Sequence, residues 1–181
     1  MELETRRLLL RPLREDDAPA MARALNNYAV VKNLSRVPFP YRLEHAEQFI
    51  AIQKGFDDRS VISAISFRAA PDELIGLVSY EFASGETHAE FGYWLHEACW
   101  DMGIMSEAAE ALVTYAFGAG QVEELRSGFW NPVSGRILRN LGFEETHEAP
   151  IFSAAQNREV PAIKLRLSRL MWTEQQKSRA A

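Results

Sequence analysis

The stretch EFGYWLHEACWDMGIMSEAAEALVTYAF, residues 90–117, changes its hydrophobic period once along its length. Its first residues continue the run THAEFGYWL, which is typical of a strand. Further on, the apolar residues that recur at helical spacing are Ile104, Ala108, Ala111, Leu112 and Tyr115. Between the two patterns lies a short acidic turn with a single glycine, Gly103. The stretch therefore predicts a strand, a glycine turn and a long helix.

A turn of this kind, followed directly by a helix, presents free main-chain N–H groups and the positive end of the helix dipole. An anion such as a pyrophosphate would fit there, with Gly103 allowing a close approach of the backbone. Amides would come from Met102, Gly103, Ile104, Met105 and Ser106. Glycine at a strand-to-helix turn is also common for folding reasons alone, so the turn by itself leaves both interpretations open.

The pattern on either side of this stretch predicts a mixed sheet with helices, an α/β or α+β design. In chain order we expect strand 6–13, helix 14–25, helix 41–56, strands 60–69, 73–82 and 87–95, the helix after Gly103, strand 123–130, helix 133–143 and strand material to Leu170. Three consecutive strands joined by short turns indicate an antiparallel meander. We expect residues 1–170 to form one domain and residues 171–181 to be a polar, frayed tail.

Composition excludes several classes of protein. The 181 residues are 47% hydrophobic and carry a formal net charge of -5, which makes nucleic acid an unexpected partner. The one cysteine, Cys99, excludes an intrachain disulfide, and no neighbour in sequence would serve it as a base. No apolar run reaches the length of a membrane span, and MELETRR lacks the apolar core of a secretory signal. We therefore expect a cytoplasmic protein without a membrane partner.

Two blocks, residues 90–117 and NPVSGRILRNLGF at 131–143, resemble the GNAT superfamily of acetyl-CoA-dependent N-acetyltransferases. They are most similar to the branch that contains the ribosomal-protein alanine N-acetyltransferases. ETRRLLLRPLREDD, YRLEHAEQFI and ELIGLVSY resemble the same branch, so the similarity extends from residue 4 to about residue 167. It implies a mixed, mostly antiparallel central sheet flanked by about four helices, acetyl-CoA as co-substrate, and no metal.

The resemblance also implies roles for individual residues. The strand that contains Tyr93, Trp94 and Leu95 would splay from its neighbour and offer main-chain groups to the pantetheine arm of CoA, and the loop 100–106 would hold the pyrophosphate. Trp100 stands where the family usually has Arg or Gln, and Met105 stands where it has Gly or Ala. These departures remove a side-chain donor and crowd one close approach of the backbone.

Further roles follow from the second block of the resemblance. Asn131 would hold the pantetheine arm, and Ser134 would protonate the departing thiolate. Arg136 would reach the ribose phosphate of CoA, although the sequence favours the alternative of an exposed helix arginine without a ligand.

Acetyl transfer to an amine needs a base for the amine, a polarised carbonyl and a proton for the thiolate. Glu90 is our candidate for the base, with a solvated charge on an exposed strand as the alternative. Tyr93 is a possible second acid. The late carboxylate that is frequent in the ribosomal-protein branch has no clear match near Glu148.

We therefore expect an N-acetyltransferase that moves the acetyl group directly to a primary amine, either a protein N-terminus or a small molecule. A CoA-binding module with weak or lost catalysis is the alternative, and a protein-interaction domain is a third. Residues that contact the acceptor should come from the two early helices and the late hairpin. Exposed strand edges would allow a homodimer.

Overall fold

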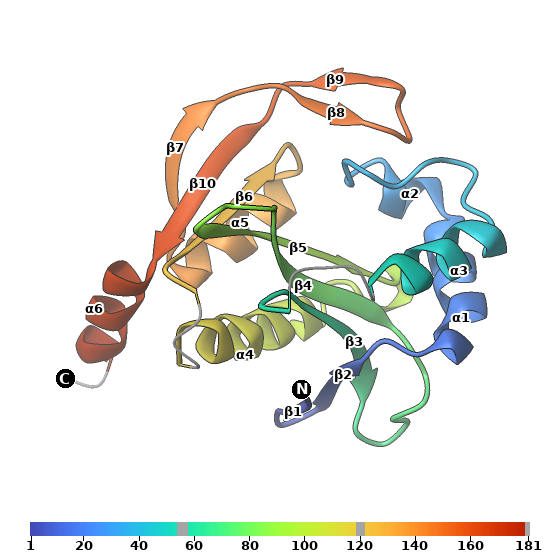
Figure 1. Ribbon diagram of the computed structural model, residues 1–181, viewed down its shortest axis with the longest axis horizontal. Helices are drawn as coiled ribbons and strands as arrows, with labels where there is room; N and C mark the ends of the chain where they lie inside the picture. Colours follow the sequence, from blue (N-terminus) through green and yellow to red (C-terminus); the bar gives the residue numbers. More distant parts are fainter. Residues whose placement is uncertain (54–57, 119–121, 180–181) are drawn as a thin grey trace.

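An eight-stranded sheet forms the centre of the computed structural model, which describes residues 1–53, 58–118 and 122–179 (Figure 1). The strands lie in the order β1-β2-β3-β4-β5-β6-β10-β7. Their bounds are β1 Leu3–Glu4, β2 Leu8–Pro12, β3 Val61–Phe67, β4 Gly76–Phe82, β5 His88–Leu95, β6 Glu124–Phe129, β10 Ile163–Ser168 and β7 Glu144–Glu148. Neighbouring strands are antiparallel except β5 and β6, which are parallel. The expected meander, β3-β4-β5, is confirmed.

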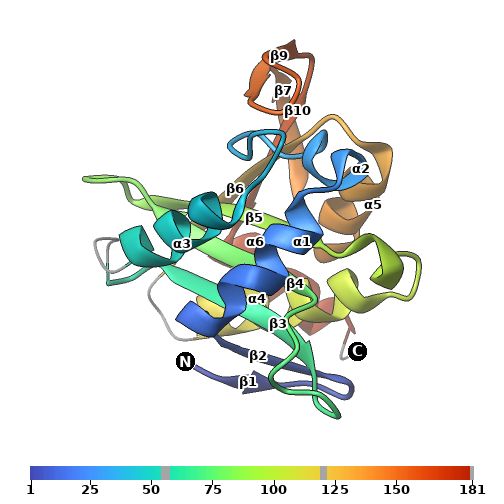
Figure 2. The ribbon, with the colours of Figure 1, turned by 90° about the vertical axis from the view of Figure 1, so that its right-hand side faces the viewer.

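Helices cover both faces of this sheet. On one face α4 (Ile104–Gly118) and α5 (Pro132–Leu141) pack over inward-facing side chains such as Tyr80, Phe91 and Leu125. On the other face α1 (Ala18–Leu25) and α3 (Leu43–Ile52) pack over Leu77 and Trp94 (Figure 2). Because successive strand residues point to opposite faces, both faces of the central strands are apolar and both become buried.

The boundaries of the predicted helices are largely confirmed. Helix α4 begins at Ile104, directly after Gly103. Gly142 ends α5 in the left-handed region at φ 95°, where its N–H donates to the carbonyl oxygens of Leu138 and Arg139. Helix α3 ends at Ile52, whereas the pattern predicted helix to residue 56, and residues 54–57 lie outside the described part of the chain.

Two helical segments were not expected. A short helix, α2 (Tyr28–Val31), follows α1. The expected fraying of the C-terminal tail is wrong for most of its length, because Arg169–Arg179 form helix α6. The Trp172 ring packs against the ring of Phe117 at 5.6 Å between centroids. Tertiary contact therefore orders a sequence that is polar on its own. In none of the described helices is there a segment both long and apolar enough to span a membrane.

A buried ion pair ties strand β2, which pairs with β3, to the helical layer. The Arg11 guanidinium of β2 donates to both oxygens of Asp17, at 2.8 and 2.7 Å, just before α1. Arg11 is fully buried and its Nε donates to the carbonyl of Pro71 at 2.9 Å. The hydrogen bond with Asp17 raises the pKa of Arg11 above its ordinary value, so the guanidinium stays charged.

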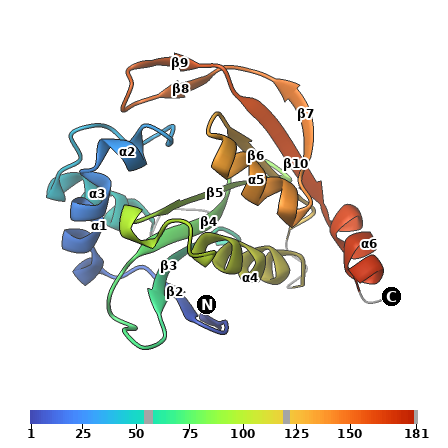
Figure 3. The same cartoon turned by 180° about the vertical axis from the view of Figure 1, so that it is seen from behind.

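A small hairpin extends beyond the main sheet. Strands β8 (Ile151–Ser153) and β9 (Arg158–Val160) form it, and it lies beside α2 rather than over the meander (Figures 1 and 3). It is fixed there by hydrogen bonds from the Ala154 N–H to the Ser35 carbonyl at 2.8 Å and from Gln156 Nε2 to the Lys32 carbonyl at 2.8 Å. The early helical segment and the late hairpin thus meet on one side of the sheet.

Candidate active site

The sheet opens between β5 and β6, which are the only parallel neighbours among the described strands. Strands β5 and β6 pair at three positions, the last of which is Glu90 with Arg126. One residue later, the Ser127 hydroxyl donates to the carbonyl of Phe91 at 2.9 Å, and the strand ladder does not continue. Beyond this point the edge of β5 faces a gap, as the sequence similarity implied.

The main chain of Tyr93 faces this gap. The N–H of His96 donates to the Ile75 carbonyl, so even-numbered residues of β5 direct their main-chain groups toward β4. The Leu95 carbonyl points away from β4 and accepts a hydrogen bond from the Trp100 indole at 2.9 Å. Because main-chain groups alternate in direction along a strand, the N–H and C=O of Tyr93 point into the gap with those of Leu95.

A cavity of about 310 Å³ lies on the α4 side of the gap, and we call it the loop cavity because the loop 100–106 forms one wall. The predicted cofactor-binding residues that line it are Tyr93, Trp94, Leu95, Gly103, Ile104, Met105, Ser106 and Asn131, and the predicted catalytic residue Ser134 lines it too. Two predicted residues do not line it. Met102 is 52% exposed, and Arg136 is an exposed residue on α5.

The turn that leads into α4 is held from the side of the N-terminal strands. Gly103 adopts φ 70°, which only glycine adopts without strain, and Asp101 adopts φ 58°. The Arg7 guanidinium donates to the Met102 carbonyl at 2.9 Å and to Glu107 of α4 at 2.7 Å. The first turn of α4 thereby presents main-chain N–H groups that have no acceptor within the helix.

Trp100 and Met105, the two loop residues that differ from the usual family pattern, have different contacts in the structure. The Trp100 indole uses its N–H on the Leu95 carbonyl, so this side chain fastens the loop to the end of β5 instead of offering a donor to a ligand. Met105 is 6% exposed and belongs to the core under α4. Met105 also lines the loop cavity, so the expected crowding of a close approach there stays a prediction.

Tyr93 and Ser134 connect the two sides of the gap. The Tyr93 hydroxyl donates to the Ser134 carbonyl at 3.1 Å, and burial raises the pKa of Tyr93 well above its ordinary value. The phenol therefore stays protonated. Asn131 caps α5 by accepting a hydrogen bond from the Val133 N–H at 2.9 Å, which leaves its amide NH₂ free to donate toward the loop cavity.

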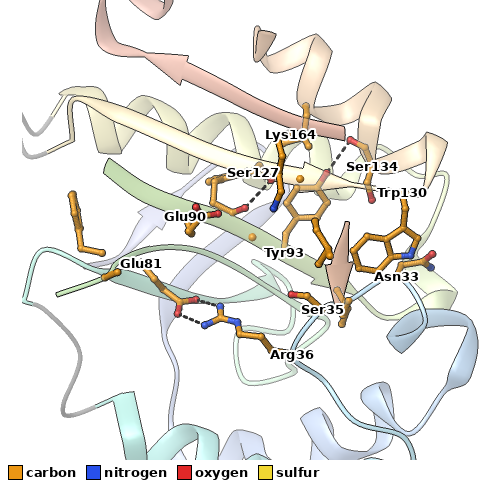
Figure 4. Close-up of a pocket in the computed structure, with 18 of the residues that line it drawn as sticks. Asn33, Ser35, Arg36, Glu81, Glu90, Tyr93, Ser127, Trp130, Ser134 and Lys164 are labelled. Atoms are coloured by element: carbon orange, nitrogen blue, oxygen red, sulfur yellow. Dashed lines mark hydrogen bonds and ion pairs between the residues drawn. The ribbon is translucent and has the colours of Figure 1, made fainter. Parts of the chain in front are cut away.

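A second cavity, of about 800 Å³, lies across the gap and also includes Tyr93 and Ser134 (Figure 4). We call it the hairpin cavity, since Ile151 of β8 forms part of its wall. Glu90 lines it, as do Glu81 and Lys164. Of the segments expected to contact the acceptor, the late hairpin borders this cavity through Ile151, whereas no described residue of the early helices 14–25 and 41–56 lines it. Residues 33–36, in the loop between those helices, line it instead.

Sequence reasoning did not single out Lys164 or Arg36. The alternating residues KLRLSR, 164–169, are typical of a strand with one solvent-exposed face, and Lys164 lies on that face of β10. This alternation shows which residues share the face, but the packing of the hairpin decides that part of the face becomes a cavity wall. The His88 ring, on the same strand as Glu90, contacts Glu86 and Arg126 at 3.2 Å each.

Residues 7–144 match the family described as Acetyltransferase (GNAT) domain. An uncharacterized N-acetyltransferase of Bacillus subtilis (strain 168), YoaA, is 28% identical over 151 residues, which cover 79% of this chain and 82% of that protein.

Two solved structures share the fold. An acetyltransferase of the GNAT family from Bacillus anthracis has a TM-score of 0.78 at 18% identity, covering 94% of this chain and 99% of that one. A ribosomal L7/L12 alpha-N-protein acetyltransferase, RimL, in complex with coenzyme A, has a TM-score of 0.76 at 19% identity, covering 93% and 98%.

Proposed function

Since the chain belongs to the GNAT family of acetyltransferases and is an acetyl-CoA-dependent N-acetyltransferase, we propose that its two cavities divide the substrates between them. The loop cavity binds acetyl-CoA and the hairpin cavity binds the primary amine. The observation that carries this division is the early end of the β5–β6 ladder at Glu90, because it places Tyr93 and Ser134 at the junction of both cavities.

The loop cavity suits the chemistry of CoA. A pyrophosphate is bound by main-chain N–H groups at the start of α4, where Gly103 keeps the backbone accessible. The free edge of β5 and the amide of Asn131 supply donors and an acceptor to the amide groups of the pantetheine arm. Met102 contributes its main chain alone, and Arg136 contributes only if its exposed side chain reaches the ribose phosphate.

The residues at the junction have complementary roles in proton transfer. Glu90 accepts a proton from the amine, directly or through water, since its carboxylate lines the hairpin cavity. Main-chain N–H groups of β5 that face the gap stabilise negative charge on the carbonyl oxygen of the thioester. The Ser134 hydroxyl gives a proton to the departing thiolate. The Tyr93 phenol holds the Ser134 main chain and is a positioning residue.

The acceptor is a protein N-terminus or a small amine. To test the proposal, CoA thiol release would be measured with N-terminal peptides, polyamines, amino acids and aminoglycosides, alongside calorimetric titration of acetyl-CoA. We expect binding of acetyl-CoA and turnover of at least one class of amine, with turnover lost in Ser134→Ala. Absence of acetyl-CoA binding at submillimolar ligand would count against the whole proposal.

A CoA-binding module without catalysis is the second candidate. It is motivated by Trp100, which stands where the family usually has a side chain that can donate to the ligand, and whose indole N–H is bonded to the Leu95 carbonyl. The same measurements separate the two. Binding of acetyl-CoA without thiol release on any amine supports the module, whereas release that depends on Glu90 excludes it.

A further inference from the structure

Some of the charged side chains that line the hairpin cavity are paired with each other, and others are not. Arg36 and Glu81 form a two-point ion pair, with N–O distances of 3.0 and 3.1 Å, and the Ser79 hydroxyl also donates to Glu81. Their charges compensate each other within the protein. Among the described residues that line the cavity, the carboxylate of Glu90 and the ammonium of Lys164 have no ion-pair partner. The cavity therefore offers one free negative and one free positive group.

The backbone opposite Lys164 lets its side chain reach the gap. Lys164 of β10 pairs with Gly128 of β6. A Cβ atom on Gly128 would lie 3.3 Å from the Cδ atom of Lys164 and 2.8 Å from Ile151. The lysine stem thus crosses the space that a side chain at position 128 would fill, and Figure 4 shows the ammonium group beside the Tyr93 ring.

We propose that the acceptor is a small molecule with a carboxylate close to its amine, of the amino-acid type, and that Lys164 binds this carboxylate. The inference rests on the proposed function and specifies its acceptor. A substrate amine near Glu90 and a substrate carboxylate on Lys164 satisfy both free charges of the cavity. A polyamine would place a second cation beside Lys164.

A peptide N-terminus is a poorer match for the same reason. It carries an amide where the amino acid carries its carboxylate, so Lys164 would lose water on binding without gaining a charged partner.

Free amino acids and their carboxamides provide the test. The members of each pair differ in the carboxylate and, through it, in the basicity of the amine, and the second difference is the same for every protein variant. The measured quantity is the ratio of kcat/KM for the acid to that for the amide, at saturating acetyl-CoA. We expect wild-type protein to favour the acid of its best pair at least tenfold. In Lys164→Met this preference should fall by roughly 10- to 100-fold, mainly through KM. Lys164→Arg should retain most of it.

Arg166→Met is the matched control. Arg166 lies on the same face of β10 two residues along and is absent from the cavity lining. This variant should keep the wild-type ratio, and the melting temperatures of all variants verify their folding.

Equal or better turnover of amides or peptide N-termini by the wild type overturns the inference, as does an unchanged ratio in Lys164→Met. Failure of the proposed function looks different, because no amine is then turned over. In that event the acid and amide are titrated against the CoA-loaded protein, and equal binding of the two overturns the inference independently.

Discussion

Glu90 of β5 stands directly opposite Arg126 of β6, and this is the last position at which the two parallel strands pair. Arg126 does not neutralise it, because the guanidinium is bonded to Glu124 at 2.7 Å. The carboxylate thus stays available at the point where the sheet opens and the cavities meet. The proposed base lies at this position because the ladder stops there.

Replacing Glu90 by Gln tests this assignment. We expect kcat to fall roughly 10²-fold, in the range of general base catalysis, while the Kd for acetyl-CoA stays near that of wild type. Steady-state rates and calorimetry give the two quantities. Glu159→Gln, an exposed change on β9 outside both cavities, serves as the control and should behave as wild type. A full rate in Glu90→Gln would assign the base elsewhere.

Gly103→Ala tests the turn before α4. Gly103 has φ 70°, and alanine is strained in that conformation, so the main-chain N–H groups of the turn should shift and acetyl-CoA should bind about tenfold more weakly. Gly85→Ala is a matched control, since Gly85 has φ 78° with open space around it and does not line either cavity. It carries the same backbone strain. Equal effects of the two variants on the Kd would refute a role of the turn in binding.

Tyr80→Phe should stabilise the protein. Tyr80 is fully buried, and its hydroxyl has no hydrogen-bond partner within the described residues. An unsatisfied buried hydroxyl costs about 1–3 kcal/mol, so its removal should raise the free energy of unfolding by roughly 1 kcal/mol at pH 8. Urea unfolding measures the change, and Tyr28→Phe, at a 46% exposed residue, should have little effect.

The same residue predicts a pH dependence. Burial raises the pKa of Tyr80 to about 12 and that of Tyr41 to about 12. Below pH 10 both phenols are protonated in the folded and unfolded states. Between pH 10 and about 12 only the unfolded chain loses these protons, so stability should fall as pH rises. The advantage of Tyr80→Phe should therefore be larger at pH 11 than at pH 8, and a constant difference would contradict the raised pKa.

Asp17→Asn should destabilise the fold strongly. It leaves the Arg11 guanidinium buried without its counter-charge, which typically costs 3–5 kcal/mol. Asp72→Asn removes the partner of Arg14 in an exposed pair, where the loss should stay below about 1 kcal/mol. Urea unfolding of both variants separates the two cases, and similar losses would show that burial does not govern the Arg11 pair.

Local patterns were sufficient for the elements around the site. The change of period between β5 and α4 and the glycine between them predicted strand, turn and helix, because side-chain alternation and helical spacing are properties of a few consecutive residues. The helix predicted at 133–143 matches α5 closely for the same reason, since the caps at Asn131 and Gly142 depend on local backbone geometry.

Other features depend on contacts between distant segments. Helix α6 is polar in sequence, and the contact between the Trp172 and Phe117 rings orders it. No local pattern therefore predicted it. The outcomes for Met105 and Trp100 also needed the tertiary structure. Met105 packs in the core, and the Trp100 indole bonds to the Leu95 carbonyl. Neither contact follows from the residue type alone.

The sequence by itself determined the strand–turn–helix around Gly103, the mixed sheet and the family, because these follow from hydrophobic periodicity and from motifs of neighbouring residues. Only the tertiary structure decided where β5 leaves β6, and which charges meet in the hairpin cavity. Glu90 and Lys164 are 74 positions apart in a chain of 181 residues. They line one cavity because strand order and the docking of the hairpin bring them together, and that depends on packing across the whole chain.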